Sequence, residues 1–350
     1  MATPTIPNGK DYFNVVNYSG TGSDNAVTGV GFAPDSTWLK RRDSGLADWG
    51  VFDTSRGVTK NLKFNKTDAE TTEVNSLKTF GTDGFTVGSS GDYNASGGTF
   101  SSFNFLANGG TTESISAGGD IDIASVVQKN TTAGFSIVQY TGNGNSTDGQ
   151  GVGHGLSVAP RWIIVKELSS TDNWNVWHGT FGNEKILLDS DGAKFSSTAF
   201  GNFTPSSTIF KVRGSNTNAS STTYVAYCWN EIPGYSKFSS YTGNGSTSGD
   251  GTFVYLGFTA QFIMIKETGN SNDWMIWDNA RFPLNPTNNS LFANLPQGDN
   301  SSSIDLDVLS NGFKCRTNNS QINRSSGSYI FCAFASNPFV GDGTNPVTAR

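Results

Sequence analysis

The chain carries one set of sequence landmarks three times, and this repetition limits the fold more than any other feature. Each copy opens with Tyr-x-Gly-x-Gly, continues with a strand ending in lysine and a strand starting with tryptophan, and closes with an asparagine six residues before an aromatic strand. The opening motif starts at Tyr18, Tyr140 and Tyr241, so successive copies are roughly 100–120 residues apart. Units of this length can form domains, whereas the repeats of solenoids have roughly 20–45 residues. We therefore expect three similar units in tandem.

Each copy has the pattern of an all-β unit. Short apolar segments such as Trp162–Val165 are separated by clusters of Gly, Asn, Asp and Ser, which are turn residues. Charged residues make up only 15% of the chain, but aromatic residues reach 12%, which suits β-strands with aromatic cores. Only residues 67–77 allow a short helix. The pattern predicts tandem antiparallel β-sandwich domains of a jelly-roll-like kind, each folding on its own core.

The spacing of the landmarks also sets the expected boundaries. The first copy is followed by about twenty additional residues rich in Gly, Ser and Thr, a composition typical of a linker. The predicted organisation is an N-terminal arm at 1–10, a first repeat at 11–107, a linker or insertion at 108–133, a second repeat at 134–232, a third repeat at 233–340 and a C-terminal tail at 341–350. The short arm is a candidate for packing on a neighbouring subunit.

Several classes of protein are disfavoured by composition. The sequence has no apolar segment near the roughly 18 residues of a membrane helix, and its net charge of −6 offers no basic surface for nucleic acid. Cys228, Cys315 and Cys332 replace apolar residues of the other copies, so we expect buried, reduced thiols. His154 and His178 have no second ligand at metal-binding spacing. We expect no cofactor and no metal.

Nearly the whole chain, roughly residues 11–340, resembles a repeat domain of virion structural proteins from tailed bacteriophages, especially marine ones. The segments that carry the resemblance are Gly31–Arg41, Phe52–Gly57, Gly134–Gly144, Thr223–Trp229 and Ser328–Phe339. The resemblance implies a non-enzymatic virion component, tail-fibre-like, with no catalytic residues to carry over. It further implies assembly in the host cytoplasm with other virion proteins and a homo-oligomer, for which a trimer is the expectation by analogy. The lack of an apolar leader at the N-terminus agrees with release by lysis.

A few residues are candidates for recognition of a host-surface glycan. Aromatic rings flanked by polar groups can bind sugars, and some aromatic positions differ between copies. The candidates are Trp38, Trp162, His178, Asp53, Arg56, Asp278 and Arg281. The Asp and Arg residues are three apart after a strand, a spacing that favours a local ion pair in a turn. The tryptophans found in all three copies, Trp49, Trp174 and Trp274, are instead expected in the core.

Two other functions stay open at the level of sequence. A capsid-decorating protein would bind the shell without a receptor, and its sequence would look similar. A polysaccharide depolymerase would need paired carboxylates for acid–base chemistry. Such a pair does not occur at matching positions in the three copies, which makes the enzyme the weaker alternative.

Overall fold

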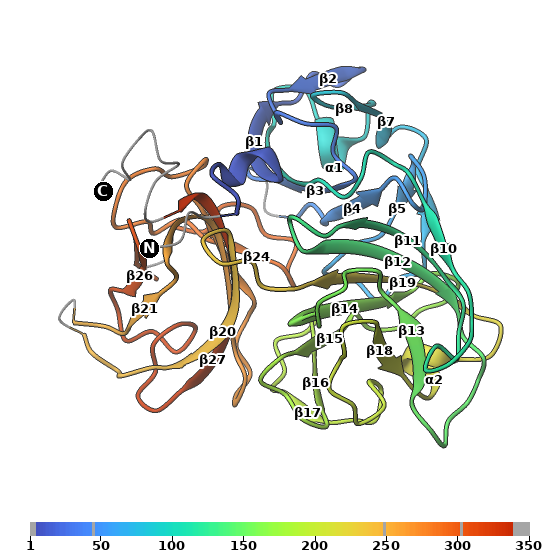
Figure 1. The fold of residues 1–350 in the computed structure, drawn as a ribbon. Helices are drawn as coiled ribbons and strands as arrows, with labels where there is room; N and C mark the ends of the chain where they lie inside the picture. Colours follow the sequence, from blue (N-terminus) through green and yellow to red (C-terminus); the bar gives the residue numbers. More distant parts are fainter. Residues whose placement is uncertain (1–4, 44–45, 248–249, 302–303, 339–350) are drawn as a thin grey trace.

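In a computed structural model, the three copies form three lobes around a common centre (Figure 1). The structure describes residues 5–43, 46–247, 250–301 and 304–338. Every strand pair within its sheets is antiparallel, which confirms the predicted all-β class. None of the helices in these ranges is long and apolar enough to cross a membrane.

Each lobe combines a larger sheet with a smaller one. The first has η1 (Gly9–Asp11), β1 (Phe13–Ser19), β2 (Asn25–Thr28), β3 (Ser36–Arg41), β4 (Gly50–Asp53), β5 (Lys60–Asn61), β6 (Thr71–Thr72), β7 (Leu77–Gly81), β8 (Gly84–Val87), α1 (Gly91–Asn94) and β9 (Thr99–Phe105). The second has β10 (Glu113–Ile115), β11 (Ser125–Asn130), β12 (Phe135–Thr141), β13 (Gln150–Gly153), β14 (Trp162–Glu167), β15 (Asn175–His178), β16 (Glu184–Leu187), β17 (Phe195–Ser196), β18 (Ile209–Val212), α2 (Ser215–Asn218) and β19 (Thr223–Trp229). The third has β20 (Ser236–Thr242), β21 (Phe253–Tyr255), β22 (Phe258–Glu267), β23 (Met275–Asp278), β24 (Leu291–Phe292), β25 (Leu306–Leu309), β26 (Gly312–Cys315) and β27 (Ser328–Pro338).

The large sheets of the three lobes share one strand order and one register. The orders are β1-β9-β3-β4, β12-β19-β14-β15 and β20-β27-β22-β23. The tyrosine of each opening motif pairs with the aromatic residue six positions after the asparagine: Tyr18 with Phe100, Tyr140 with Tyr224 and Tyr241 with Tyr329. These ring pairs stack with centroids 4.9–5.1 Å apart. Identical registers establish which residues of the three lobes are equivalent.

The three lobes share one hydrophobic core, which the sequence analysis did not predict. Strand β14 is buried along its whole length, so both of its faces are covered. One face packs inside its own lobe, and the other meets the large sheets of the two neighbouring lobes. A continuous cluster includes Phe105, Trp229 and Phe334, one equivalent residue from each lobe. The expectation that each repeat packs only around its own core is therefore wrong, because the large sheets of the three lobes meet in this cluster. A second, separate cluster, which includes Leu39, Phe52 and Tyr93, belongs to the first lobe alone.

The structure decides one open alternative and corrects two further expectations. Residues 108–133, predicted as a linker or an insertion, are an insertion that supplies β10 and β11, which extend the large sheet of the second lobe. The described part of the N-terminal arm packs on its own chain, where Ile6 is buried in the shared core and η1 contacts β27. Residues 67–77 form no helix but extended chain with the short strand β6. The predicted tail 341–350 lies outside the described residues.

Candidate functional site

The predicted recognition tryptophans lie at the centre of the molecule. Trp38 is 3% exposed and Trp162 is 1% exposed, so neither ring can stack against a ligand in solution. Trp38 contacts Trp229 of the second lobe and Phe262 of the third. The cavity beside these rings measures only about 10 Å³ and is lined by apolar side chains. The interpretation of these two residues as a surface site is wrong, since the centre is a filled, apolar junction.

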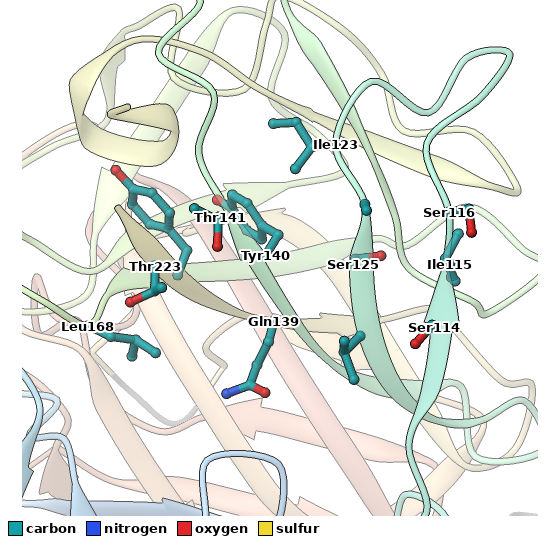
Figure 2. Close-up of a pocket in the computed structure, with 13 residues that line it drawn as sticks. Ser114, Ile115, Ser116, Ile123, Ser125, Gln139, Tyr140, Thr141, Leu168 and Thr223 are labelled. Atoms are coloured by element: carbon teal, nitrogen blue, oxygen red, sulfur yellow. The ribbon is translucent and has the colours of Figure 1, made fainter. Parts of the chain in front are cut away.

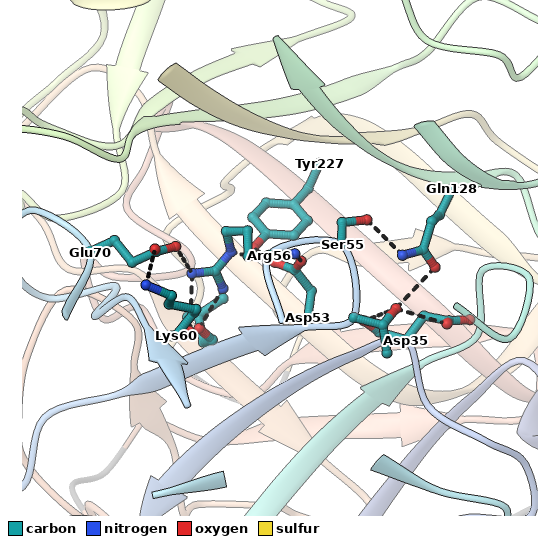
Figure 3. Close-up of polar contacts among 10 residues, drawn as sticks. Asp35, Asp53, Ser55, Arg56, Lys60, Glu70, Gln128 and Tyr227 are labelled. Atoms are coloured by element: carbon teal, nitrogen blue, oxygen red, sulfur yellow. Dashed lines mark hydrogen bonds and ion pairs between the residues drawn. The ribbon is translucent and has the colours of Figure 1, made fainter. Parts of the chain in front are cut away.

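The predicted charged candidates are buried as well, in two equivalent triads. In the first lobe, Arg56 contacts Asp53 at 2.6 Å and Glu70 at 3.1 Å. Tyr227 of the second lobe donates a 2.7 Å hydrogen bond to Asp53, as Figure 3 shows. In the third lobe, Arg281 contacts Asp278 at 2.5 Å and Asp299 at 2.8 Å. The expectation of a local ion pair is confirmed, but the alternative role in surface recognition is wrong because the guanidinium groups and their partners at 53 and 278 are buried.

The second lobe replaces the whole triad with a different set. His178, Phe181 and Lys194 occupy the equivalent positions, and the ammonium group of Lys194 lies 5.4 Å from the centroid of the Phe181 ring. The ring of His178 packs edge-on against Phe181, with centroids 5.7 Å apart. Burial lowers the pKa of His178 to about 3, so its imidazole is neutral at physiological pH. The ammonium group of Lys194 also pairs with Glu184 at 2.6 Å, so the second lobe makes a different set of contacts at all three positions.

The tryptophans common to all copies connect the lobes in a closed cycle. Each indole Nε1 donates to a backbone carbonyl at one equivalent position of the preceding lobe: Trp174 to Lys63 at 2.9 Å, Trp274 to Leu187 at 2.8 Å and Trp49 to Phe292 at 2.7 Å. The third bond joins the first lobe to the last and so closes the ring. We call the accepting stretches the clasp segments, residues 63–70, 187–194 and 292–299.

The next-to-last residue of β3, β14 and β22 is a lysine that binds the same segments. Its Nζ donates to the carbonyl four residues after the tryptophan's acceptor: Lys166 to Thr67 at 3.2 Å, Lys266 to Asp191 at 2.9 Å and Lys40 to Pro296 at 2.7 Å. Backbone bonds flank each lysine in the same cyclic order, such as Asp172 N to Thr67 O at 3.0 Å and Glu70 N to Leu168 O at 2.9 Å. Burial lowers the pKa of Lys40 and of Lys266 to about 8.

The asparagine of each repeat forms its hydrogen bonds within its own lobe. Asn218 is buried, accepts a 2.9 Å bond from the backbone of Asn143 and donates to the carbonyl of Asn145 at 3.0 Å. Asn94 and Asn323 make equivalent bonds to Thr21 and Asn244. These amides fix the loop that follows each Tyr-x-Gly-x-Gly motif. Parts of these Asn-rich loops are therefore held by internal contacts.

A shallow groove of about 580 Å³ lies where the insertion joins the second lobe (Figure 2). It is bordered by β10, β11 and β12 and by the start of β19. Hydroxyl groups such as those of Ser114 and Thr223 alternate there with apolar side chains such as Ile115 and Leu168. None of its lining residues is Asp, Glu, His or Lys. Its two tyrosines, Tyr140 and Tyr224, have pKa values raised by burial and donate their hydroxyl protons to backbone carbonyls.

A second hollow, of about 430 Å³, lies at the junction of the first and third lobes. Its carboxylates are paired: Asp299 with Arg42 and Arg281, and Asp43 with Arg41. The hydrogen bond from Arg41 lowers the pKa of Asp43, which keeps this group ionised. Within the described ranges, no group of three or more His, Cys, Asp and Glu side chains is placed to hold a metal ion.

The three thiols behave as apolar side chains. Cys228, Cys315 and Cys332 are buried and unbonded to one another, as predicted. Burial raises the pKa of Cys315 to about 12 and raises the pKa of the other two further. Thiols that stay protonated are poor nucleophiles.

A comparison with protein families matches residues 8–338 to a domain of unknown function, DUF7483. The chain belongs to the DUF7483 family. The match runs through all three repeats and the insertion, so the DUF7483 domain spans the complete ring rather than one repeat. No curated protein and no solved structure matches the chain.

Proposed function

We propose that this DUF7483 protein is a non-enzymatic structural component of a tailed-phage particle, tail-fibre- or spike-like, and that it contributes to recognition of host-surface glycans. The observation that carries the proposal is the cyclic set of clasps. Three lobes closed on one core, with indole and ammonium groups bound to backbone carbonyls, make a body that opens only when several contacts break together. Such a body suits a particle component that must stay folded outside the cell.

The use of the charged groups supports a role without catalysis. Asp and Arg residues occupy matching positions in the first and third lobes, and in both lobes they form buried ion pairs with each other. The groove of the second lobe is lined by hydroxyl and apolar groups and has no carboxyl group among its lining residues. Catalysis of sugar transfer would need two carboxyl groups with distinct pKa values facing one space.

The proposal is tested by locating the chain on intact particles. Particles released by lysis from cells that carry the gene are purified, treated with antibody against the recombinant protein and imaged by electron microscopy. Label on the tail or its fibres is expected. Label over the shell would favour capsid decoration, and particles without the protein, as judged by mass spectrometry, would contradict a structural role. Release of reducing sugar from host polysaccharide by the purified protein would contradict the non-enzymatic assignment.

A further inference from the structure

The third lobe carries two exposed aromatic rings side by side on its small sheet. Phe253 is 45% exposed and Tyr255 is 55% exposed, whereas Val254 between them is buried. Residues two apart on a strand point to the same face, so both rings project outward from β21 while Val254 points inward. Two large aromatic side chains on one outer face are unusual in a chain that buries most of its other aromatic residues.

The fold does not need aromatic residues at these two positions. The registers Val254 with Phe313, Val27 with Phe85 and Val152 with Phe210 align the small sheets of the three lobes. The aromatic pair therefore corresponds to Ala26 and Thr28 in the first lobe and to Gly151 and Gly153 in the second. In the second lobe the insertion covers this face, since a Cβ atom at Gly151 would meet the Asp120 carbonyl and one at Gly153 would meet Ile115. The first lobe, however, forms the same sheet with the exposed residues Ala26 and Thr28, so the strand pairing of the third lobe does not require aromatic residues at 253 and 255.

The neighbouring strands surround the rings with polar groups. Phe253 pairs across the sheet with Lys314, which in turn pairs with Asp307. Lys314 Nζ lies 3.8 Å from Asp250, and Arg316 Nε lies 3.4 Å from Asp307. Asp305 lies on the same outer face as Asp307 and opposite Arg316, so three acidic and two basic side chains lie on this face, which has no excess of positive charge.

A glycine of β26 lies next to the rings. Gly312 pairs with Tyr255, and a Cβ atom there would lie 2.1 Å from the carbonyl oxygen of Val254 and 3.1 Å from Cε2 of Phe253. The close approach of the β21 backbone therefore requires glycine, and the Phe253 ring packs against the same position. We call Phe253, Tyr255 and Lys314, with Asp307 beside them, the aromatic platform.

We propose that the aromatic platform binds a polysaccharide of low net charge, whose pyranose rings stack on Phe253 and Tyr255 while their hydroxyls bond to the charged side chains around them. The apolar C–H face of a sugar ring suits an aromatic face, and ionised groups make strong hydrogen bonds to hydroxyls. The lack of an excess of positive charge disfavours nucleic acid, which needs such an excess. This inference rests on the glycan recognition proposed above and gives it a location.

A second copy of the chain fits the platform less well. Strand β21 is at the edge of its sheet but has only three residues, and short edge strands bordered by charges are poor templates for pairing. Self-association is accordingly an outcome that the experiment distinguishes.

The test is affinity electrophoresis of the full chain in native gels that contain dextran, laminarin, galactomannan or agarose-derived galactan. The variant Phe253→Ala/Tyr255→Thr gives β21 the residues of β2, so it is expected to fold. Phe195→Ala, which removes another exposed aromatic ring far from the platform in sequence, is the matched control. We expect at least one polymer to retard the wild type and the control, and the double variant to lose about tenfold or more in apparent affinity.

Three results would overturn the proposal. Retardation of the double variant to the same extent would place sugar binding elsewhere and leave the proposed function standing. If none of the polymers retards the wild type, glycan binding at the platform is contradicted. Concentration-dependent dimerisation in analytical ultracentrifugation, lost in the double variant, would assign the rings to self-association. None of these results bears on whether the chain is found in the particle.

Discussion

The indole Nε1 of Trp274 donates a 2.8 Å hydrogen bond to the backbone carbonyl of Leu187, which belongs to the preceding lobe. The same relationship holds at the two other junctions, so each lobe accepts a tryptophan from the next. Because the third junction returns to the first lobe, the chain forms a ring without a free end lobe. The contacts at the junctions, rather than exposed side chains, explain why tryptophan occurs at this position in each copy.

Replacing Trp274 by Phe tests how much one bond between an indole and a carbonyl adds to the free energy of unfolding. Trp277 provides a matched control, since it is also fully buried and its Nε1 has no hydrogen-bond partner among the described residues. Both Trp→Phe changes remove the same volume, but only Trp274→Phe breaks a bond and leaves the Leu187 carbonyl without its indole donor. We expect Trp274→Phe to cost about 1–2 kcal/mol more than Trp277→Phe. Urea denaturation measures the difference, and equal costs would show that the clasp bond adds no stability.

The buried lysines predict a pH dependence. The pKa of Lys266 is about 8 in the folded chain and near 10.5 when exposed, so the unfolded chain binds more protons between these values. Stability from this group therefore rises with pH across the window from 8 to 10.5. The buried thiols have the opposite effect, because their raised pKa values make stability fall as pH rises. The contribution of Lys266 must therefore be obtained by comparison with a variant that lacks it.

Comparing the free energies of unfolding of the wild type and Lys266→Met isolates the contribution of this lysine. We expect the difference in free energy of unfolding, wild type minus variant, to increase by about 1–2 kcal/mol between pH 7.5 and pH 9.5. Lys78→Met, at an exposed lysine, is the control for loss of a positive charge. A difference that stays constant over this range would show that Lys266 is charged and well solvated in the folded state.

The triads predict strong coupling between three positions of the second lobe. Phe181→Arg alone places a guanidinium beside Lys194, whose ammonium group already pairs with Glu184, and we expect a loss of about 3–5 kcal/mol. Adding His178→Asp and Lys194→Glu supplies the carboxylates of the Asp53, Arg56 and Glu70 arrangement, and Glu184→Gln removes the carboxylate that would repel the one introduced at 194. Together these changes should recover most of the loss, and thermal denaturation of the single and quadruple variants checks the expectation. Additive losses would mean that the three positions do not form one unit.

The sequence predicted the elements of the fold better than their assembly. Apolar strands and turn clusters indicated antiparallel sheets, and the repetition of Trp49, Trp174 and Trp274 indicated core positions. The segment Trp162–Val165 is apolar on both faces, which was a signal that its sheet is covered twice. A single unit of about 100 residues hides only one face, so the second face required neighbours.

The clasps could not be found from sequence because their acceptors are backbone carbonyls. Lys63, Leu187 and Phe292 accept equivalent bonds, yet their side chains have nothing in common. Likewise, Asp53 and Arg56 suggested a surface site only because their burial depends on Tyr227 of another lobe. Contacts between distant segments decided the location of every candidate.

The most direct test of the shared core is the near-ultraviolet circular dichroism of residues 234–338 produced alone and heated. The account predicts a fragment without fixed tertiary structure and without a cooperative transition, because Phe262, Met264 and Phe334 would lose the aromatic partners of the other lobes. The full chain should melt in a single cooperative transition. A fragment with a native-like spectrum and its own sharp transition would contradict the account, since the lobes would then be independent domains.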